Sequence, residues 1–218
     1  MKTWNAWFYI PYLAALAAGI FILKNFEKGQ DVLFLNQMHH PALDVLFAYG
    51  TFLGDGLMYL IVVAVLVFFS YRKAFVALIC FAITGLVVQV LKRIVFPEIY
   101  RPSVFLSGYE LHFVEGVKIL SRYSFPSGHS AMAFSLFSLL SQLVKPRWYG
   151  LIFICLALIG GISRIYLVQH FFIDVYFGSL IGVAVTTIVW MVCLQHADTP
   201  PRFLRGSLRD ALFKPYEV

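Results

Sequence analysis

The chain has 218 residues, of which 61% are hydrophobic and 13% charged, and its formal net charge is +6. Soluble domains have about 45–50% apolar and about 25% charged residues, so this composition excludes a soluble globular domain, a disordered chain and a fibrous protein. No alternating β-barrel pattern is present, which leaves a polytopic all-α membrane protein. The basic residues lie in short segments between apolar runs, and this placement favours lipid head groups over nucleic acid as their partners.

Six apolar segments follow one another along the chain, and we expect each to be a transmembrane helix of one bundle. They cover residues 5–23, 57–71, 74–91, 129–144, 149–167 and 172–194. The second and fourth are shorter than the roughly 20 residues that a crossing needs, and an earlier start would lengthen both. The pattern predicts a six-helix domain over residues 1–196 and a basic cytosolic tail over residues 197–218.

The loops on the two sides of this predicted bundle differ in charge. With the N-terminus inside, the inner segments are very short, carry slightly more than half of the Lys and Arg residues and contain almost no acidic residues. Positive charge is denser in loops on the cytosolic side of a membrane. We therefore expect an integral protein of a bacterial inner membrane, with both termini in the cytosol.

Polar residues that stand out against the apolar sequence form three clusters. They are Lys92, Arg93 and Arg101 after the third segment; Ser127, Gly128 and His129 at the start of the fourth; and Arg164, His170 and Asp174 between the fifth and sixth. In an up-and-down bundle these helix ends all lie on the outer face. The sequence therefore predicts a site at the outer membrane–water boundary, facing the periplasm or exterior.

The residue types in these clusters suit phosphoryl transfer without a metal. Lys and Arg side chains supply fixed donors for a tetrahedral oxyanion, and the first turn of a helix starting at Gly128 adds free backbone N–H groups. Two histidines can serve as nucleophile and as acid. His170 and Asp174 are four residues apart, so a helix start would place the carboxylate beside one imidazole nitrogen and leave the other free.

Two of the clusters resemble known signatures. Pro126-Ser127-Gly128-His129, and the run Ser163-Arg164, five residues, His170, three residues, Asp174, resemble the second and third signatures of the type 2 phosphatidate phosphatase superfamily. That superfamily contains membrane lipid phosphatases and the soluble vanadium haloperoxidases. The motifs cover residues 92–174, and the six-helix layout covers most of the chain.

The resemblance implies a role for each residue. His170 would be the nucleophile and form a phosphohistidine, Asp174 would orient it, and His129 would protonate the leaving oxygen and then deprotonate a water. The groups implied to hold the phosphate oxygens are Lys92, Arg101, Ser127, the Gly128 amide and Arg164. Neither a metal nor another cofactor is implied.

The first signature departs from the pattern of the family. The family has a Lys, six residues and then Arg-Pro, whereas eight residues separate Lys92 from Arg101-Pro102. We favour Lys92 because lysine is the family's residue, while Arg93, which leaves seven residues, stays open. Either the two extra residues bulge around Pro97, or Arg93 takes the role of the lysine.

These expectations indicate an integral membrane phosphatase that removes a phosphate from a lipid phosphate or diphosphate. Analogy with small members of the family favours undecaprenyl diphosphate, with phosphatidate, phosphatidylglycerol phosphate and lipid A as alternatives. Two other functions stay open: a lipid phosphotransferase that passes the group to a second lipid, and a non-catalytic binder or transporter of anionic lipids. The sequence does not determine the oligomeric state.

Further polar residues lie outside the three clusters. We expect His39 and His40 to belong to a loop rather than to a metal site, because no third ligand stands at a useful spacing. Asp55 is expected to start a helix. A supporting contact of Asp55 with the site, and a head-group role for Glu110 and His112, stay open.

Overall fold

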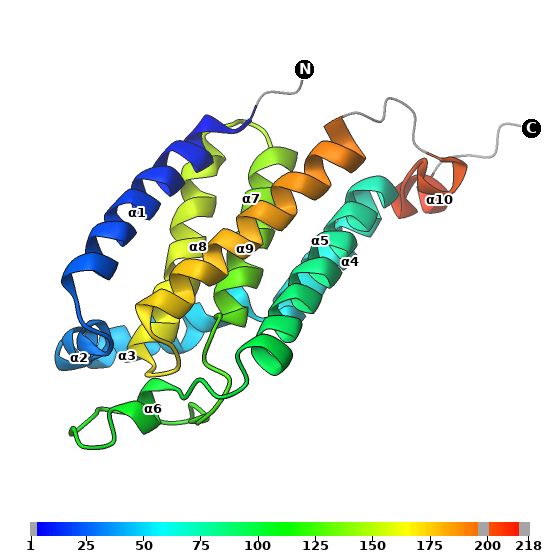
Figure 1. The fold of residues 1–218 in the computed structure, drawn as a ribbon. Helices are drawn as coiled ribbons and strands as arrows, with labels where there is room; N and C mark the ends of the chain where they lie inside the picture. Colours follow the sequence, from blue (N-terminus) through cyan, green and yellow to red (C-terminus); the bar gives the residue numbers. More distant parts are fainter. Residues whose placement is uncertain (1–3, 196–200, 214–218) are drawn as a thin grey trace, which may run out of the picture.

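The computed structural model describes residues 4–195 and 201–213, and every regular element within these ranges is a helix (Figure 1). The predicted all-α membrane fold is therefore confirmed. The six expected segments form α1 (Ala6–Asn25), α4 (Gly56–Phe69), α5 (Tyr71–Val90), α7 (Gly128–Leu143), α8 (Tyr149–Tyr166) and α9 (Phe172–Trp190). Two π-helical turns, η2 (Leu91–Val95) and η3 (Met191–Gln195), extend α5 and α9.

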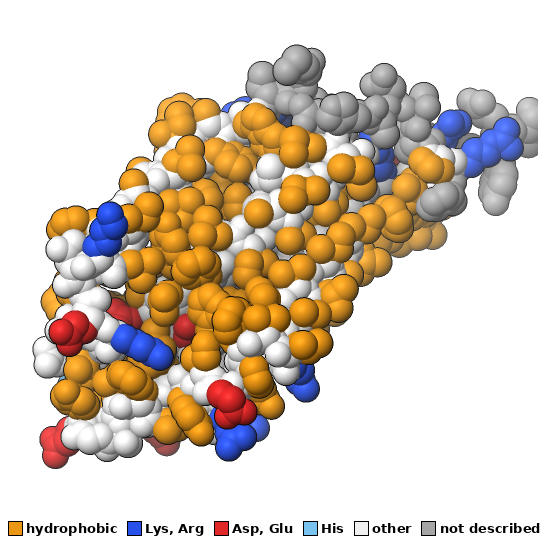
Figure 2. All heavy atoms as spheres, viewed as in Figure 1, with side chains coloured by type: hydrophobic (Ala, Val, Ile, Leu, Met, Phe, Trp, Pro, Cys, Tyr) orange, Lys and Arg blue, Asp and Glu red, His pale blue; other side chains and the backbone are white. Residues whose placement is uncertain are grey.

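The lengths of these helices do not give six full crossings. Four described helices are long and apolar enough to cross a membrane, and a fifth span results if the pair Pro41–Gly54 and Gly56–Phe69, bent by 56°, is counted as one. Of the six expected spans, α7 is the one that is too short to cross even when that pair is counted as one. Its 16 residues rise only about 24 Å, whereas the hydrocarbon layer is about 30 Å thick. On the face shown in Figure 2, hydrophobic side chains form a broad band between charged groups at the two ends.

Helix α7 can be short because protein encloses it. It packs against α8, α9 and α5, and most of its side chains are buried, several of them serines. Ser135 joins the side chains of four helices: its hydroxyl bonds Tyr59 of α4 at 3.1 Å, Thr84 of α5 at 3.4 Å and Thr186 of α9 at 2.8 Å. Because a buried hydroxyl without a partner costs about 1–3 kcal/mol, this network fixes the rotation of each helix about its axis.

Helix α9 crosses α7 at two glycines, Gly178 and Gly182. A Cβ on Gly182 would lie 2.2 Å from the carbonyl oxygen of Ala131, and one on Gly178 would lie 2.5 Å from that of Ser127. These obstacles are backbone atoms, so only glycine allows the two helices to approach so closely. The crossing holds the start of α7 against the start of α9, and both starts carry predicted site residues.

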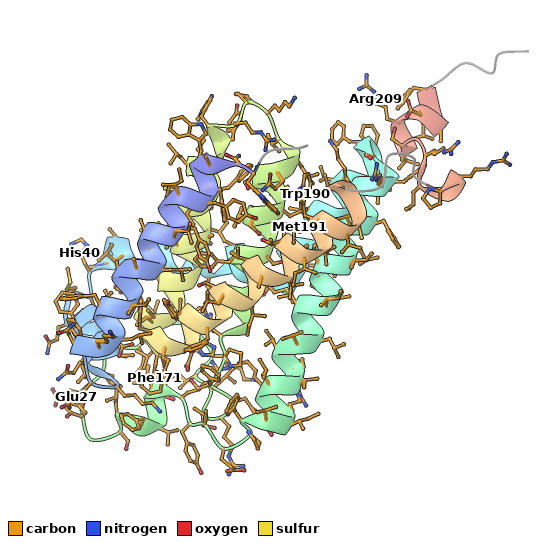
Figure 3. The ribbon with its side chains drawn as sticks, turned by 45° about the horizontal axis from the view of Figure 1, so that its top comes forward. Glu27, His40, Phe171, Trp190, Met191 and Arg209 are labelled. Carbon is orange, nitrogen blue, oxygen red and sulfur yellow. The ribbon has the colours of Figure 1, made fainter. Side chains whose placement is uncertain are left out.

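The segment between α1 and α4 is more ordered than the sequence indicates. It folds into α2 (Gln30–Gln37), α3 (Pro41–Gly50) and the 3₁₀-helix η1 (Thr51–Gly54), which lie at the same end of the bundle as the short α6 (Pro102–Phe105) (Figure 1). Figure 3 shows Glu27 and Phe171 at this end and Trp190 and Met191 at the opposite end. The three predicted clusters lie at the end that carries Phe171.

The last described residues, 201–213, dock on the bundle. The 3₁₀-helix η4 (Arg202–Leu204) packs against α5, and α10 (Leu208–Phe213) packs against α4. The carbonyl of Gly206 accepts a hydrogen bond of 3.1 Å from the N–H of Tyr71. Residues 197–200 and 214–218 of the predicted tail lie outside the described ranges.

The glycine crossing gives a test of the fold. Gly182→Ala should destabilise the protein by about 1–3 kcal/mol and lower its melting temperature in detergent by about 5 °C, because α9 must move away from α7. Gly85→Ala is the matched control, since its Cβ would meet only the flexible end of Met132 at 3.2 Å. Equal melting temperatures for the two variants would contradict this account of the crossing.

Candidate active site

A cavity of about 500 Å³ opens at the end of the bundle where α5 and α8 finish and α7 begins. The three polar clusters of the sequence meet there. Its lining includes Lys92, Arg101, Gly128, His129, Arg164 and His170. The other two predicted residues, Ser127 and Asp174, are almost fully buried. One end of the fold thus brings together side chains that are up to 82 positions apart in the chain.

His170 lies in the short turn between α8 and α9 and is 1% exposed. Its Nδ1 is 3.2 Å from Oδ2 of Asp174, one helical turn further along. The same carboxylate oxygen accepts hydrogen bonds from the backbone N–H of Phe171 at 3.1 Å and from the hydroxyl of Ser124 at 2.5 Å. Since Oδ2 acts as an acceptor, Nδ1 of His170 carries the proton, and Nε2 keeps its lone pair.

The surroundings keep this imidazole uncharged. Burial, followed by the positive charges of Arg101, Lys92 and Arg164, holds the pKa of His170 well below its usual value of about 6.5. The ring is therefore neutral at pH 7, which a nitrogen nucleophile requires. Because His170 is almost inaccessible elsewhere, a reactant can reach it only through the cavity that it lines.

Lys92 and Arg101 are held by carbonyl oxygens of one loop. Nζ of Lys92 donates to the carbonyl of Tyr123 at 2.7 Å, and Nε of Arg101 donates to that of Arg122 at 2.9 Å. A second nitrogen of Arg101 donates to the backbone carbonyl and side-chain Oε1 of Gln169, at 3.0 and 3.1 Å. Burial lowers the pKa of Arg101 to about 10, so the guanidinium stays charged at neutral pH.

Arg164 has a side-chain N–H donor that no described residue accepts from. One of its terminal nitrogens donates to the hydroxyl of Thr51 in η1 at 2.5 Å. Its Nε is buried and has no hydrogen-bond partner among the described residues, although the side chain lines the cavity. A buried N–H without an acceptor is costly, and an anion bound in the cavity would supply one.

The start of α7 forms another part of the cavity wall. Ser127 is the N-cap residue, and its hydroxyl accepts from the backbone N–H and the hydroxyl of Ser130, at 3.3 and 2.8 Å. The structure thus gives this hydroxyl a capping contact, and a phosphate contact of Ser127 stays a prediction. Gly128 and His129 face the cavity at the positive end of the helix dipole. Gly54 packs against the backbone of His129, where a Cβ would lie 2.3 Å from its carbonyl oxygen.

The unusual spacing of the first cluster has a local structural basis. Residues 91–95 form a π-helical turn, closed by a 2.7 Å bond from the N–H of Phe96 to the carbonyl of Leu91, and a turn follows before Arg101. A π-turn takes up more residues than an α-turn. Lys92 is 7% exposed inside the cavity, whereas Arg93 is exposed at its edge and bonds Gln89 at 2.9 Å.

Three contributors to the site escape sequence reasoning. Ser124 bonds Asp174, Gln169 holds Arg101, and Thr51 holds Arg164. Ser124 and Gln169 lie within two positions of motif residues in the chain, and that position is the only signal they give. Thr51 comes from a distant segment that reads as a plain loop, so no pattern indicates it.

A second polar cluster lies away from the cavity lining. His112 is 3.0 Å from Asp44 and stacks on His39 with ring centroids 4.3 Å apart, while Tyr166 donates to Asp44 at 2.5 Å. His40 caps α3, and Asp55 caps α4 as expected. Neither Asp55, Glu110 nor His112 lines the cavity. Within residues 4–195 and 201–213, no group of three or more His, Cys, Asp or Glu side chains is placed to hold a metal ion.

These observations define what the site can do chemically. Three buried cations line one open cavity, the N-terminus of α7 forms part of its wall, and so does a neutral imidazole held by a carboxylate. This arrangement suits a tetrahedral anion that is attacked by nitrogen. A second imidazole, that of His129, lines the same cavity, which places it within the space where a proton could be exchanged with a bound reactant.

Comparison with known proteins agrees with this chemistry. The family model of the PAP2 superfamily matches residues 73–197. No curated protein sequence matches. Among solved structures, LpxE from Aquifex aeolicus is similar at 30% identity and a TM-score of 0.66, over 76% of this chain and 96% of that chain.

A second similar structure is the first transmembrane PAP2-type phosphatidylglycerolphosphate phosphatase from Bacillus subtilis. It matches at 24% identity and a TM-score of 0.61, over 90% of this chain and 98% of that chain, and at this identity the likeness supports the fold. The family match covers more than half of the 218 residues. The chain therefore belongs to the PAP2 superfamily and is an integral membrane lipid phosphatase.

Proposed function

We propose that the protein hydrolyses the terminal phosphate of a lipid phosphate or diphosphate through a phosphohistidine on His170, with no metal in the reaction. The observation that carries this proposal is the cavity itself. His170 lines it together with Lys92, Arg101 and Arg164, its Nδ1 is bonded to Asp174, and the Nε of Arg164 lacks an acceptor among the described residues. Positioning and charge stabilisation are the main needs of phosphoryl transfer, and these groups supply both.

The first step forms one bond and breaks another. Nε2 of His170 attacks phosphorus as the bond between phosphorus and the bridging oxygen breaks, and the leaving lipid oxygen takes a proton from His129. The positive charge that develops on the imidazole is stabilised by the Asp174 carboxylate bonded to Nδ1. Lys92, Arg101 and Arg164 stabilise the charge on the nonbridging oxygens.

The second step returns the enzyme to its starting state. His129, now neutral, removes a proton from a water that attacks the phosphohistidine. The N–P bond breaks, inorganic phosphate leaves, and His129 is protonated for the next cycle. Phosphate therefore appears in stoichiometric amount with the dephosphorylated lipid, whereas transfer to a second lipid would release none.

The substrate and the orientation are further parts of the proposal. Analogy within the family favours undecaprenyl diphosphate. The position of the cavity at one end of an apolar bundle lets a head group enter while the lipid chain stays in the bilayer. The charge of the loops favours cytosolic termini and a cavity on the periplasmic or exterior side. A phosphate-release panel of undecaprenyl diphosphate, phosphatidate, phosphatidylglycerol phosphate and lipid A would identify the substrate.

The nucleophile can be tested directly. His170→Ala should lower turnover by roughly 10³-fold or more while the protein still inserts into the membrane. When a reaction with ³²P-labelled substrate is quenched, the wild-type protein should carry radioactivity that is stable in base and labile in acid. The variant should carry none. His40→Asn is the matched control, because it changes a histidine outside the cavity and keeps a side-chain acceptor for the cap of α3. Near-normal phosphate release by His170→Ala would refute the assignment.

The first cluster offers a comparison of two neighbours. Lys92→Ala should reduce kcat by about 10²-fold, since it removes a buried donor to the transferred phosphate. Arg93→Ala should cost less than about tenfold, because that side chain is exposed, whereas Lys92 is buried. Initial rates on one lipid phosphate decide between them. A larger loss of rate for Arg93→Ala than for Lys92→Ala would assign the role of the first signature's lysine to Arg93.

Independence from metal is a separate expectation. Phosphate release should be the same with and without EDTA, and added Mg²⁺ should not raise it, because protein cations carry the charge stabilisation. Vanadate should inhibit competitively as a mimic of the transition state. A magnesium-dependent phosphatase assayed in the same detergent is the control, because its loss of activity shows that EDTA removes the metal under these conditions. Loss of activity in EDTA and its return with Mg²⁺ would contradict the proposal.

A further inference from the structure

Two arginines at the mouth of the cavity have no part in the mechanism above. Arg93 and Arg122 both line the cavity, and both are exposed, in contrast to the buried Lys92, Arg101 and Arg164. Neither guanidinium has a carboxylate within 4 Å among the described residues. Two unneutralised positive charges therefore stand where a substrate enters.

Both mouth arginines are held in place by neighbouring side chains. Nε of Arg93 donates to Oε1 of Gln89 at 2.9 Å, and its guanidinium lies over the ring of Tyr123 at 5.9 Å. The guanidinium of Arg122 lies over the ring of Tyr100 at 6.0 Å. Stacking on an aromatic face leaves the edge of the guanidinium, with its N–H groups, free for an oxyanion.

The mouth is directly connected to the inner part of the cavity. Arg93 follows Lys92 in the chain, and the carbonyl of Arg122 accepts from Nε of Arg101. The inner and outer cations are therefore neighbours through the backbone. Because all five side chains line the same cavity, they can bind two phosphates of one molecule.

The size of the cavity fits more than one phosphate. The cavity volume is about 500 Å³ on the measure by which one water needs about 10–15 Å³, whereas a phosphate has only five non-hydrogen atoms. The charges agree with the volume. With His129 protonated as in the first step, Lys92, Arg101, Arg164 and His129 carry four formal positive charges and Asp174 one negative charge. The terminal phosphate dianion is therefore neutralised without Arg93 and Arg122, whose charges remain for a further anion.

We propose that Arg93 and Arg122 form a second anion subsite, and that the substrate carries a second phosphate beside the one that is removed. The inference rests on the proposed function, which places the scissile phosphate at His170. The second phosphate has two possible sources: the inner phosphate of a lipid diphosphate, one bridging oxygen away, or a separate phosphate ester on the same head group. In both, guanidinium groups at the mouth bind phosphate oxygens through charge-assisted hydrogen bonds.

The test compares substrates that differ only in the second phosphate. The first arm compares farnesyl diphosphate with farnesyl monophosphate, which share one tail. The second arm compares lipid A, which has two separate phosphate esters, with its monophosphorylated form. Phosphate release is measured for wild type, Arg93→Ala, Arg122→Ala and the double variant. Lys118→Ala is the matched control, since it removes an exposed cation from the same loop that does not line the cavity.

The expected change is a loss of preference through KM. Exposed charge pairs contribute about 0.2–1 kcal/mol each, so a single variant should lower the ratio of kcat/KM for the doubly over the singly phosphorylated substrate about threefold, and the double variant about tenfold. Raised salt should reduce the wild-type preference as well, because the subsite is exposed. Lys118→Ala should keep the wild-type ratio. The arm that responds identifies the source of the second phosphate.

Failure of the inference can be distinguished from failure of the proposed function. An active wild type whose ratio stays the same in the double variant, in both arms, overturns the subsite alone. Calorimetric binding of inorganic diphosphate and inorganic phosphate needs no turnover: the wild type should bind diphosphate more tightly, and the double variant should lose that advantage. If both proteins prefer diphosphate over phosphate to the same extent, the subsite is overturned. This outcome does not depend on hydrolysis, so it can be read even if the proposed function has failed.

Discussion

One carboxylate oxygen connects the segments that form the candidate active site. Oδ2 of Asp174 receives hydrogen bonds from the ring of His170, the hydroxyl of Ser124 and the backbone of Phe171. It thereby joins the start of α9, the turn after α8 and the loop before α7. The backbone carbonyl of Asp174 also accepts from the N–H of Ser127 at 2.9 Å, which adds the start of α7 itself. A single acidic residue thus sets both the tautomer of the nucleophile and the positions of the segments around it.

Three cations buried around one cavity repel each other and have lost much of their hydration, which makes the empty site costly in free energy. Carbonyl oxygens of the loop before α7 and of Gln169 compensate part of this cost for Lys92 and Arg101. Arg164 keeps an unsatisfied N–H. An anion that enters relieves the remaining cost, so affinity for a phosphate follows from how the fold is built. The tight crossing of α9 and α7 holds the start of α7, which carries His129, against the start of α9, which carries Asp174.

Much of the fold and of the candidate active site could be predicted from the sequence, because apolar segments and motif spacing can be read directly from the order of residues. The six apolar segments, and the meeting of the clusters at one end, follow from hydropathy and the order of spans. The ordered α2 and α3 could not be predicted, since such short helices depend on tertiary contacts. Thr51 and Arg164 are 113 positions apart, and one sequence carries no sign that they touch. The eight-residue spacing after Lys92 was visible, but its π-turn depends on how α5 ends.

The loop between α6 and α7 is fastened at two places. Near its start, His112 is bound to Asp44 and, through its backbone, to Asn36. Near its end, the carbonyls of two successive residues, Arg122 and Tyr123, hold the cations of Arg101 and Lys92. Within this loop Arg101 and Lys92 donate to backbone carbonyl oxygens, which every amino acid possesses. Side chains along this stretch can therefore diverge among relatives without disturbing the chemistry beneath. Such an arrangement allows one hydrolytic centre to acquire new head-group preferences by drift in the loop above it.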